Sequence, residues 1–132
     1  MAIKVRLLTD DDMVEVSGWF KDRHWKIQPT SRTLPESGYL ALDDDKPVAV
    51  VWLYLTNSGI GILDWMQSKP NSGERGVFAV KKLMDYVEDI SRGSIHSLIH
   101  HTPNDKLANY LKKSCGFRLA GKENMCVRPV AE

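Results

Sequence analysis

The residues that could do chemistry gather around one stretch, the strand, turn and helix from Gly59 to Gly93. Its turn, residues 68–76, reads Ser-Lys-Pro-Asn-Ser-Gly-Glu-Arg-Gly and leads into an amphipathic helix predicted over Val77–Arg92. The first N–H groups of a helix lack an intrahelical partner, and the helix dipole favours an anion there. A glycine-bearing turn at this position therefore predicts a phosphate-binding site.

Two side chains near this stretch could move protons. Asp64 is a lone acid in an apolar predicted strand, and strict alternation places it on the same face as Met66 rather than Trp65. A buried carboxylate needs either a function or a backbone or cationic partner, and both interpretations of Asp64 stand. His100 ends the next predicted strand and is the second candidate base, against the alternative of an ordinary exposed or hydrogen-bonded histidine.

The sequence argues against a metal centre. His96, His100 and His101 lie on one predicted strand, so they alternate between its faces, and no cysteine or acid completes a ligand set. Cys115 and Cys126 are too few for a disulfide framework and lack metal-type spacing. We expect no metal and two reduced thiols.

Hydrophobic periodicity predicts the elements that must position these residues. Helices are predicted from an N-cap at Thr9, over Val77–Arg92, and from an N-cap at Thr102 to Ser114. Short connections make the second to fourth strands an antiparallel meander, and the crossover helix makes the next pairing parallel. The expectation is one α/β domain over residues 1–132, with a mixed, mostly antiparallel sheet flanked by helices. Its strands are predicted at Ile3–Leu8, Gly38–Leu42, Pro47–Leu55, Gly59–Gln67 and Ile95–His101, with a closing hairpin of Phe117–Ala120 and Met125–Arg128.

Composition narrows the function classes. The 132 residues are 42% apolar and 27% charged, with a net charge of +1, so no bulk field draws the protein to nucleic acid or to an anionic membrane. The uncharged run Pro47–Leu63 is interrupted by Asn57-Ser58-Gly59, which predicts a hairpin rather than a membrane span. The N-terminus lacks the apolar core of a signal peptide, and we expect a cytoplasmic protein.

The predicted order of elements resembles that of the GCN5-related N-acetyltransferases, the GNAT superfamily, over Ile3–Arg128. The most specific part is the C-terminal third, where Asn104-Asp-Lys-Leu-Ala108 leads through Leu111 to Cys115-Gly116-Phe117. A second part is Arg75-Gly76 ahead of the amphipathic helix. The resemblance implies an acetyl-CoA-dependent N-acetyltransferase in which an amine attacks the thioester directly within a ternary complex.

The resemblance also implies where acetyl-CoA and the acceptor bind. In that family the amides of the turn hold the pyrophosphate, and the end of the preceding strand pairs with the pantetheine arm. Carried over, the arm meets the backbone at Met66 and Ser68, with Asn104 beside it. An amine acceptor, a small molecule or a protein, enters from the side of Lys21–Tyr39, where Trp25, Arg32 and Tyr39 are the predicted substrate contacts. The predicted pyrophosphate contacts are Asn71, Ser72, Gly73, Glu74, Arg75, Gly76 and Val77.

The sequence departs from the family pattern at two positions that matter for chemistry. The turn pattern Gln/Arg-x-x-Gly-x-Gly/Ala falls on residues 71–76, where only Gly76 fits and Glu74 takes the central glycine position. A carboxylate there repels a pyrophosphate, which Arg75 and Lys69 partly offset. Lys112 stands where the family has its acid tyrosine. Tyr110 lies about 200° away around the helix and cannot simply substitute. Lys112 and Tyr110 are both kept as candidate catalytic residues.

Three hypotheses follow. The first is the N-acetyltransferase, whose acetyl-CoA binding would be lost when Gly76 is replaced by a bulky residue. The second is a catalytically silent binding or structural protein on the same fold, like the GNAT-like proteins of tailed phages, which Glu74 and Lys112 favour. The third is that the segment 21–37 mediates a homodimer or binds another partner.

Overall fold

The computed structural model describes residues 2–23, 29–30, 33–102 and 105–117. The chain divides into two units, Met1–His100 and His101–Glu132, and each is described by itself. The first unit contains the sheet and two helices, and the second contains one described helix, α3 (Asp105–Ser114). Among the described residues, no helix combines the length and the apolar character needed to cross a membrane.

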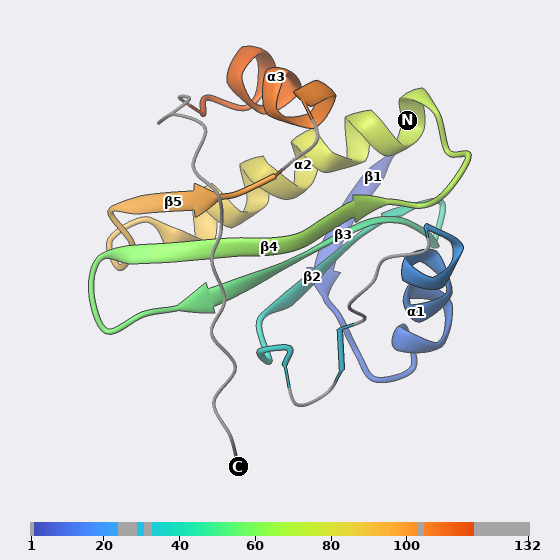
Figure 1. Ribbon diagram of the computed structural model, residues 1–132, viewed down its shortest axis with the longest axis horizontal. Coiled ribbons are helices and arrows are strands. Elements are labelled where there is room, and N and C mark those ends of the chain that lie inside the picture. The colour runs from blue at the N-terminus through green and yellow to red at the C-terminus, as the bar shows by residue number, and fades with distance from the viewer. Residues whose placement is uncertain (1, 24–28, 31–32, 103–104, 118–132) are drawn as a thin grey trace. The chain divides into compact units, whose positions relative to one another are not determined.

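The first unit is built on a five-stranded sheet whose spatial order follows the chain, β1 to β5 (Figure 1). The four pairings run antiparallel, antiparallel, antiparallel and parallel, and the last three are as the sequence predicts. Residues Asp44 and Asp45 turn β2 into β3 with positive φ angles of 49° and 66°, which matches a two-residue hairpin turn. The strands are β1 (Ile3–Leu7), β2 (Gly38–Asp43), β3 (Lys46–Leu55), β4 (Ile60–Ser68) and β5 (Ser97–His100).

Each face of the sheet buries the apolar stripe of one helix. Helix α1 (Met13–Asp22) contributes Val16, Trp19 and Phe20 to a core cluster with β2 and β3 that includes Trp52. Helix α2 (Glu74–Ser91) covers the other face with its own buried stripe. That stripe consists of Ala79, Val80, Leu83, Met84 and Val87.

Both helices of the first unit begin at a different residue than predicted. Thr9 is not the N-cap of α1. The carboxylate of Asp12 accepts hydrogen bonds from the backbone N–H and hydroxyl of Thr9, and Asp12 takes the N-cap position without a side-chain capping hydrogen bond. Helix α2 begins at Glu74 rather than Val77, because the chain leaves its left-handed turn at Gly73.

The second unit ends α3 as the sequence predicts. Gly116 has a φ of +74°, and the backbone N–H of Phe117 donates to the carbonyl of Leu111 over 3.1 Å. A glycine in the left-handed conformation just after the last turn is a common helix stop. The predicted closing hairpin lies outside the described residues, apart from Phe117.

Candidate functional site

The candidate site starts from an irregularity in β4. Trp52 pairs with Asp64 and Val50 pairs with Gln67, so two residues of β4, Trp65 and Met66, lie opposite the single residue between them on β3. Trp65 has a φ of +55°, a left-handed conformation that is rare for a bulky side chain. One extra residue in one strand of an antiparallel pair is a β-bulge.

The bulge changes which side of β4 each residue faces. Asp64 lies opposite Trp52 on the α1 face, and Trp65 packs against the same cluster, so Asp64 shares a face with Trp65 and not with Met66. The prediction that Asp64 shares a face with Met66 was wrong because it assumed uninterrupted alternation along the strand.

The bulge also decides which peptide groups face the open side of β4. The backbone N–H of Lys69 donates to the carbonyl of Val48 over 2.8 Å, so the next pair along, Ser68 with Ala49, is a non-hydrogen-bonded pair. The peptide groups of Ser68 and, two residues earlier, Met66 therefore point away from β3. Without the extra residue they would point toward it.

Strand β5 stops where this open side begins. The parallel pairing runs from Ile60 with Ser97 to Leu63 with His100, and no described strand lies alongside residues 64–68 of β4 on that side. Beyond Leu63, β4 thus presents a free edge among the described residues. Met66 and Ser68 are the positions whose backbone faces it.

His100 closes the paired part of the edge. Its Nδ1 lies 2.8 Å from the carbonyl oxygen of Leu63. A carbonyl only accepts, so Nδ1 carries the proton and donates, and Nε2 is the basic nitrogen of the neutral ring. His100 is half-buried. His101 is exposed and is the first residue of the second unit.

The free edge leads directly into the start of α2. Asn71 and Gly73 adopt positive φ angles of 64° and 59°, and Ser72 fixes the turn by donating from its hydroxyl to the carbonyl of Lys69 over 2.6 Å. No side chain caps the N-terminus of α2, and Val77 is the first residue whose N–H bonds back, to the carbonyl of Gly73 over 3.3 Å. The amides of residues 74–76 therefore begin the helix without a side-chain partner, an arrangement suited to an anion.

Side chains around this turn are partly committed to the fold. Arg75 donates to the carboxylate of Asp43, which is only 2% exposed. A Cβ on Gly76 would meet the hydroxyl of Ser72 and come within 2.7 Å of the Cβ of Ser68. Arg75 thus ties the start of α2 to the β2–β3 hairpin, and Gly76 is required by close packing. Glu74 and Val77 are exposed in the first turn.

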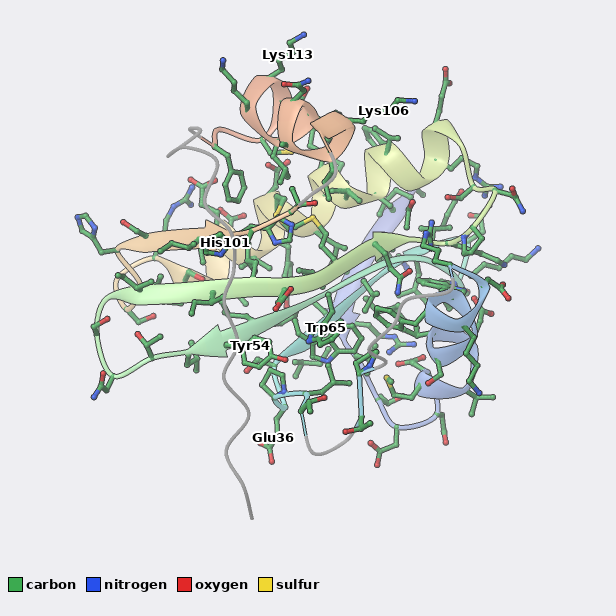
Figure 2. The ribbon with its side chains drawn as sticks, in the orientation of Figure 1. Glu36, Tyr54, Trp65, His101, Lys106 and Lys113 are labelled. Atoms are coloured by element: carbon green, nitrogen blue, oxygen red, sulfur yellow. The ribbon has the colours of Figure 1, made fainter. Side chains whose placement is uncertain are left out.

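A polar cluster on the α1 face surrounds the bulge, and sequence reasoning did not identify it. The indole Nε1 of Trp65 donates to the hydroxyl oxygen of Tyr54 over 2.8 Å, and that hydroxyl donates to the carbonyl of Thr33 over 2.7 Å (Figure 2). The backbone N–H of Trp65 donates to Oδ1 of Asp64 over 2.8 Å. Burial raises the pKa of Tyr54, the hydrogen bond from Trp65 partly opposes this shift, and the charge of Asp64 adds to it. The sequence signal that could have found this cluster is the alternation along β3, which places Trp52 and Tyr54 on the same face of the sheet.

The other predicted site residues are dispersed or outside the described residues. Tyr39 is buried under α2 with its ring 5.6 Å from that of Tyr86, and burial raises its pKa. Tyr110, half-buried, and Lys112, exposed, lie on α3 in the second unit. Their catalytic roles and the substrate role of Tyr39 stay predictions. Trp25, Arg32 and Asn104 lie outside the described residues. No cluster of His, Cys, Asp and Glu suited to a metal occurs among the described residues.

Solved structures reproduce this architecture. An acetyltransferase of the GNAT family from Staphylococcus aureus Mu50 superposes with a TM-score of 0.70 at 19% identity, covering 89% of this chain and 85% of that one. This chain has the GNAT fold. A ribosomal-protein-alanine N-acetyltransferase from Brucella melitensis biovar Abortus 2308 matches with a TM-score of 0.69 at 16% identity over 97% and 99% of the two chains.

The GNAT fold also occurs as part of longer chains. N-acetylglutamate synthase from Neisseria gonorrhoeae, solved with coenzyme A and N-acetyl-glutamate, matches with a TM-score of 0.68 at 12% identity over 85% of this chain. The present chain spans only 28% of the length of that synthase. No protein-family model and no curated protein sequence matches the chain. The expected GNAT-type architecture is therefore confirmed at the level of fold.

Proposed function

We propose that the protein is an acetyl-CoA-dependent N-acetyltransferase that acts on an amine, either a small molecule or a protein. The observation that supports this most directly is the free edge of β4, which is followed, after the turn of residues 69–73, by the uncapped start of α2. On a GNAT fold this edge suits an extended amide-bearing arm, and the helix start suits a pyrophosphate.

The proposal assigns the two parts of acetyl-CoA to separate backbone groups. The peptide groups of Met66 and Ser68 face the free edge and would hydrogen-bond the pantetheine arm. The amides that open α2, within the predicted contacts Asn71 to Val77, would hold the pyrophosphate. Arg75 acts here mainly through its tie to Asp43, which fixes the position of the helix start. Asn104, predicted beside the arm, remains part of the proposal.

The reaction is a direct transfer. The neutral amine attacks the thioester carbonyl carbon, a C–N bond forms, and the C–S bond breaks to release the thiolate of CoA. One proton leaves the amine and one is taken up by the thiolate. His100 is the candidate proton acceptor, because Nε2 is its basic nitrogen and the residue ends β5 beside the free edge. Tyr110 and Lys112 remain the candidate donors to the thiolate.

Thermal unfolding with and without millimolar acetyl-CoA tests the proposal. Ligand at about 100 times its dissociation constant adds roughly 2.7 kcal/mol, which raises the Tm by several degrees. Glu74→Gln removes the carboxylate of the first residue of α2, and its shift should exceed that of wild type because the repulsion is gone. Glu88→Gln, an exposed acid in the last turn of α2, is the matched control.

A second assay follows product formation. Acetyl-CoA with a panel of amines should release free thiol, and His100→Gln should slow that release. A Tm shift in Glu74→Gln but not in wild type would favour the silent-scaffold alternative, which Glu74 in the first turn of α2 supports. No shift in either protein would refute the acetyltransferase proposal.

A further inference from the structure

We infer that Asp64 is a positioning residue, which together with Tyr54 and Trp65 locks the β4 bulge and so aims the backbone of Met66 and Ser68 at the free edge. The part of the inference that concerns acetyl-CoA binding at the free edge rests on the proposed function. It replaces the alternative, raised from the sequence, that Asp64 serves as a base.

The left-handed backbone of Trp65 has to be held in place. Glycine adopts a positive φ at little cost, whereas a residue with a large side chain does so only when surrounding contacts favour it. At Trp65 three contacts do this. The carboxylate of Asp64 accepts the backbone N–H, Tyr54 accepts the indole N–H, and the ring of Phe20 packs edge-on at 5.9 Å.

Tyr54 connects the bulge to other segments of the chain. Its hydroxyl accepts from the indole and donates to the carbonyl of Thr33, so one oxygen links β4, β3 and the segment before β2. Its hydrogen is committed to that carbonyl, which fits the raised pKa of a partly buried phenol. Tyr54 is therefore a support and not a proton donor.

The same geometry explains what Asp64 contributes. Its Oδ1 is used by the adjacent backbone N–H, a contact that an uncharged amide oxygen could also make. A base needs the negative charge, but a lock needs only the acceptor. Asp64→Asn keeps the acceptor and removes the charge, whereas Asp64→Ala removes both. The two variants therefore separate the roles.

Amide hydrogen exchange of the full chain tests the lock without acetyl-CoA. In Asp64→Ala the amide of Trp65 should exchange about tenfold faster, and those of Met66 and Ser68 should change with it, while Asp64→Asn should stay close to wild type. Tyr54→Phe, which keeps the ring and loses both hydrogen bonds of the hydroxyl, should resemble Asp64→Ala. Asp10→Ala and Tyr86→Phe are the matched controls for an exposed acid and a tyrosine outside the lock.

Acetyl-CoA affinity by calorimetry and acetyl-transfer rate then test the consequence. Because displacement of about 1 Å can cost 100-fold in rate, we expect Asp64→Ala and Tyr54→Phe to lose about 10- to 100-fold, with substantial recovery in Asp64→Asn. Equal losses in Asp64→Asn and Asp64→Ala, with unchanged exchange at Trp65, would make Asp64 a base and overturn the inference. Unchanged exchange in both Asp64→Ala and Tyr54→Phe would overturn it too.

These outcomes are distinguishable from failure of the proposed function. If wild type binds no acetyl-CoA, the acetyltransferase proposal fails on that result, and the exchange experiment still decides whether Asp64 sets the direction of the β4 backbone.

Discussion

Replacement of Gly76 by alanine should destabilise the protein even though alanine is the better helix former. Gly76 lies in the first turn of α2, and its missing side chain leaves room for two residues of the preceding segment. An added Cβ would collide with the hydroxyl of Ser72 and lie 2.7 Å from the Cβ of Ser68. The Ser72 hydroxyl cannot simply rotate away, because it donates to the carbonyl of Lys69 over 2.6 Å.

Two opposing terms set the size of the effect. Overpacking of a rigid contact costs about 1–3 kcal/mol. Replacing glycine by alanine inside a helix returns about 1 kcal/mol. The net loss in free energy of unfolding should be roughly 0–2 kcal/mol, or a drop in Tm of up to about 8 °C for a chain of this size.

Gly18→Ala is a control within the same molecule. Gly18 lies in α1, and an added Cβ there would meet nothing within 4 Å, so the substitution should stabilise the protein by about 0.5–1 kcal/mol. Urea unfolding of both variants, and of Gly76→Ala in a Ser72→Ala background, measures the two terms. If Gly76→Ala is as stable as Gly18→Ala, the packing argument is wrong. Loss of acetyl-CoA binding in a bulkier Gly76 variant must be compared with this loss of stability.

Two ion pairs give the remaining predictions. Hydrogen bonds from Arg6, then from Thr9, hold the pKa of Asp12 at about 2 against an ordinary 3.8, so this contribution is complete above about pH 4 and is lost as the pH falls toward 2. Arg6→Gln should therefore lower the free energy of unfolding by roughly 1–2 kcal/mol at pH 7 and by little at pH 2, measured by urea titration. An equal loss at both pH values would contradict the assignment. Arg75→Gln should cost about 2–4 kcal/mol, because the buried Asp43 carboxylate loses its cation. Adding Asp43→Asn should recover part of that loss, and no recovery would show that the charge is not its cause.

The strand order and the helix–strand alternation could be predicted because they depend on local signals. Apolar periodicity located every strand of the sheet to within about two residues, and the short Asp44–Asp45 connection fixed an antiparallel neighbour. The helix starts were predicted less well. Asp12 bonds back to Thr9 and across to Arg6, and the second bond depends on a strand that lies next to it only in the folded chain.

The candidate site was also predictable only in part. The glycine turn before α2 follows from residue types, since Gly73 supplies the left-handed exit. The bulge does not follow from residue types, because no glycine marks it. Trp65 adopts a positive φ only through contacts with Tyr54 and Asp64. A pattern of alternating residues therefore placed Asp64 on the wrong face. Tertiary contacts, not local preference, decide that position.

The order of the strands in the sheet has a consequence for how the first unit comes apart. Strands β2 to β4 pair across the short connections 44–45 and 56–59, whereas β5 joins only after the whole of α2. It is held by four residue pairs at one edge of the sheet. We expect β5 to separate at a lower free energy than the meander, as a cooperative unit of its own. Strand β5 separates from the sheet along β4, so a ligand that fills the free edge of β4 would also slow the separation of β5.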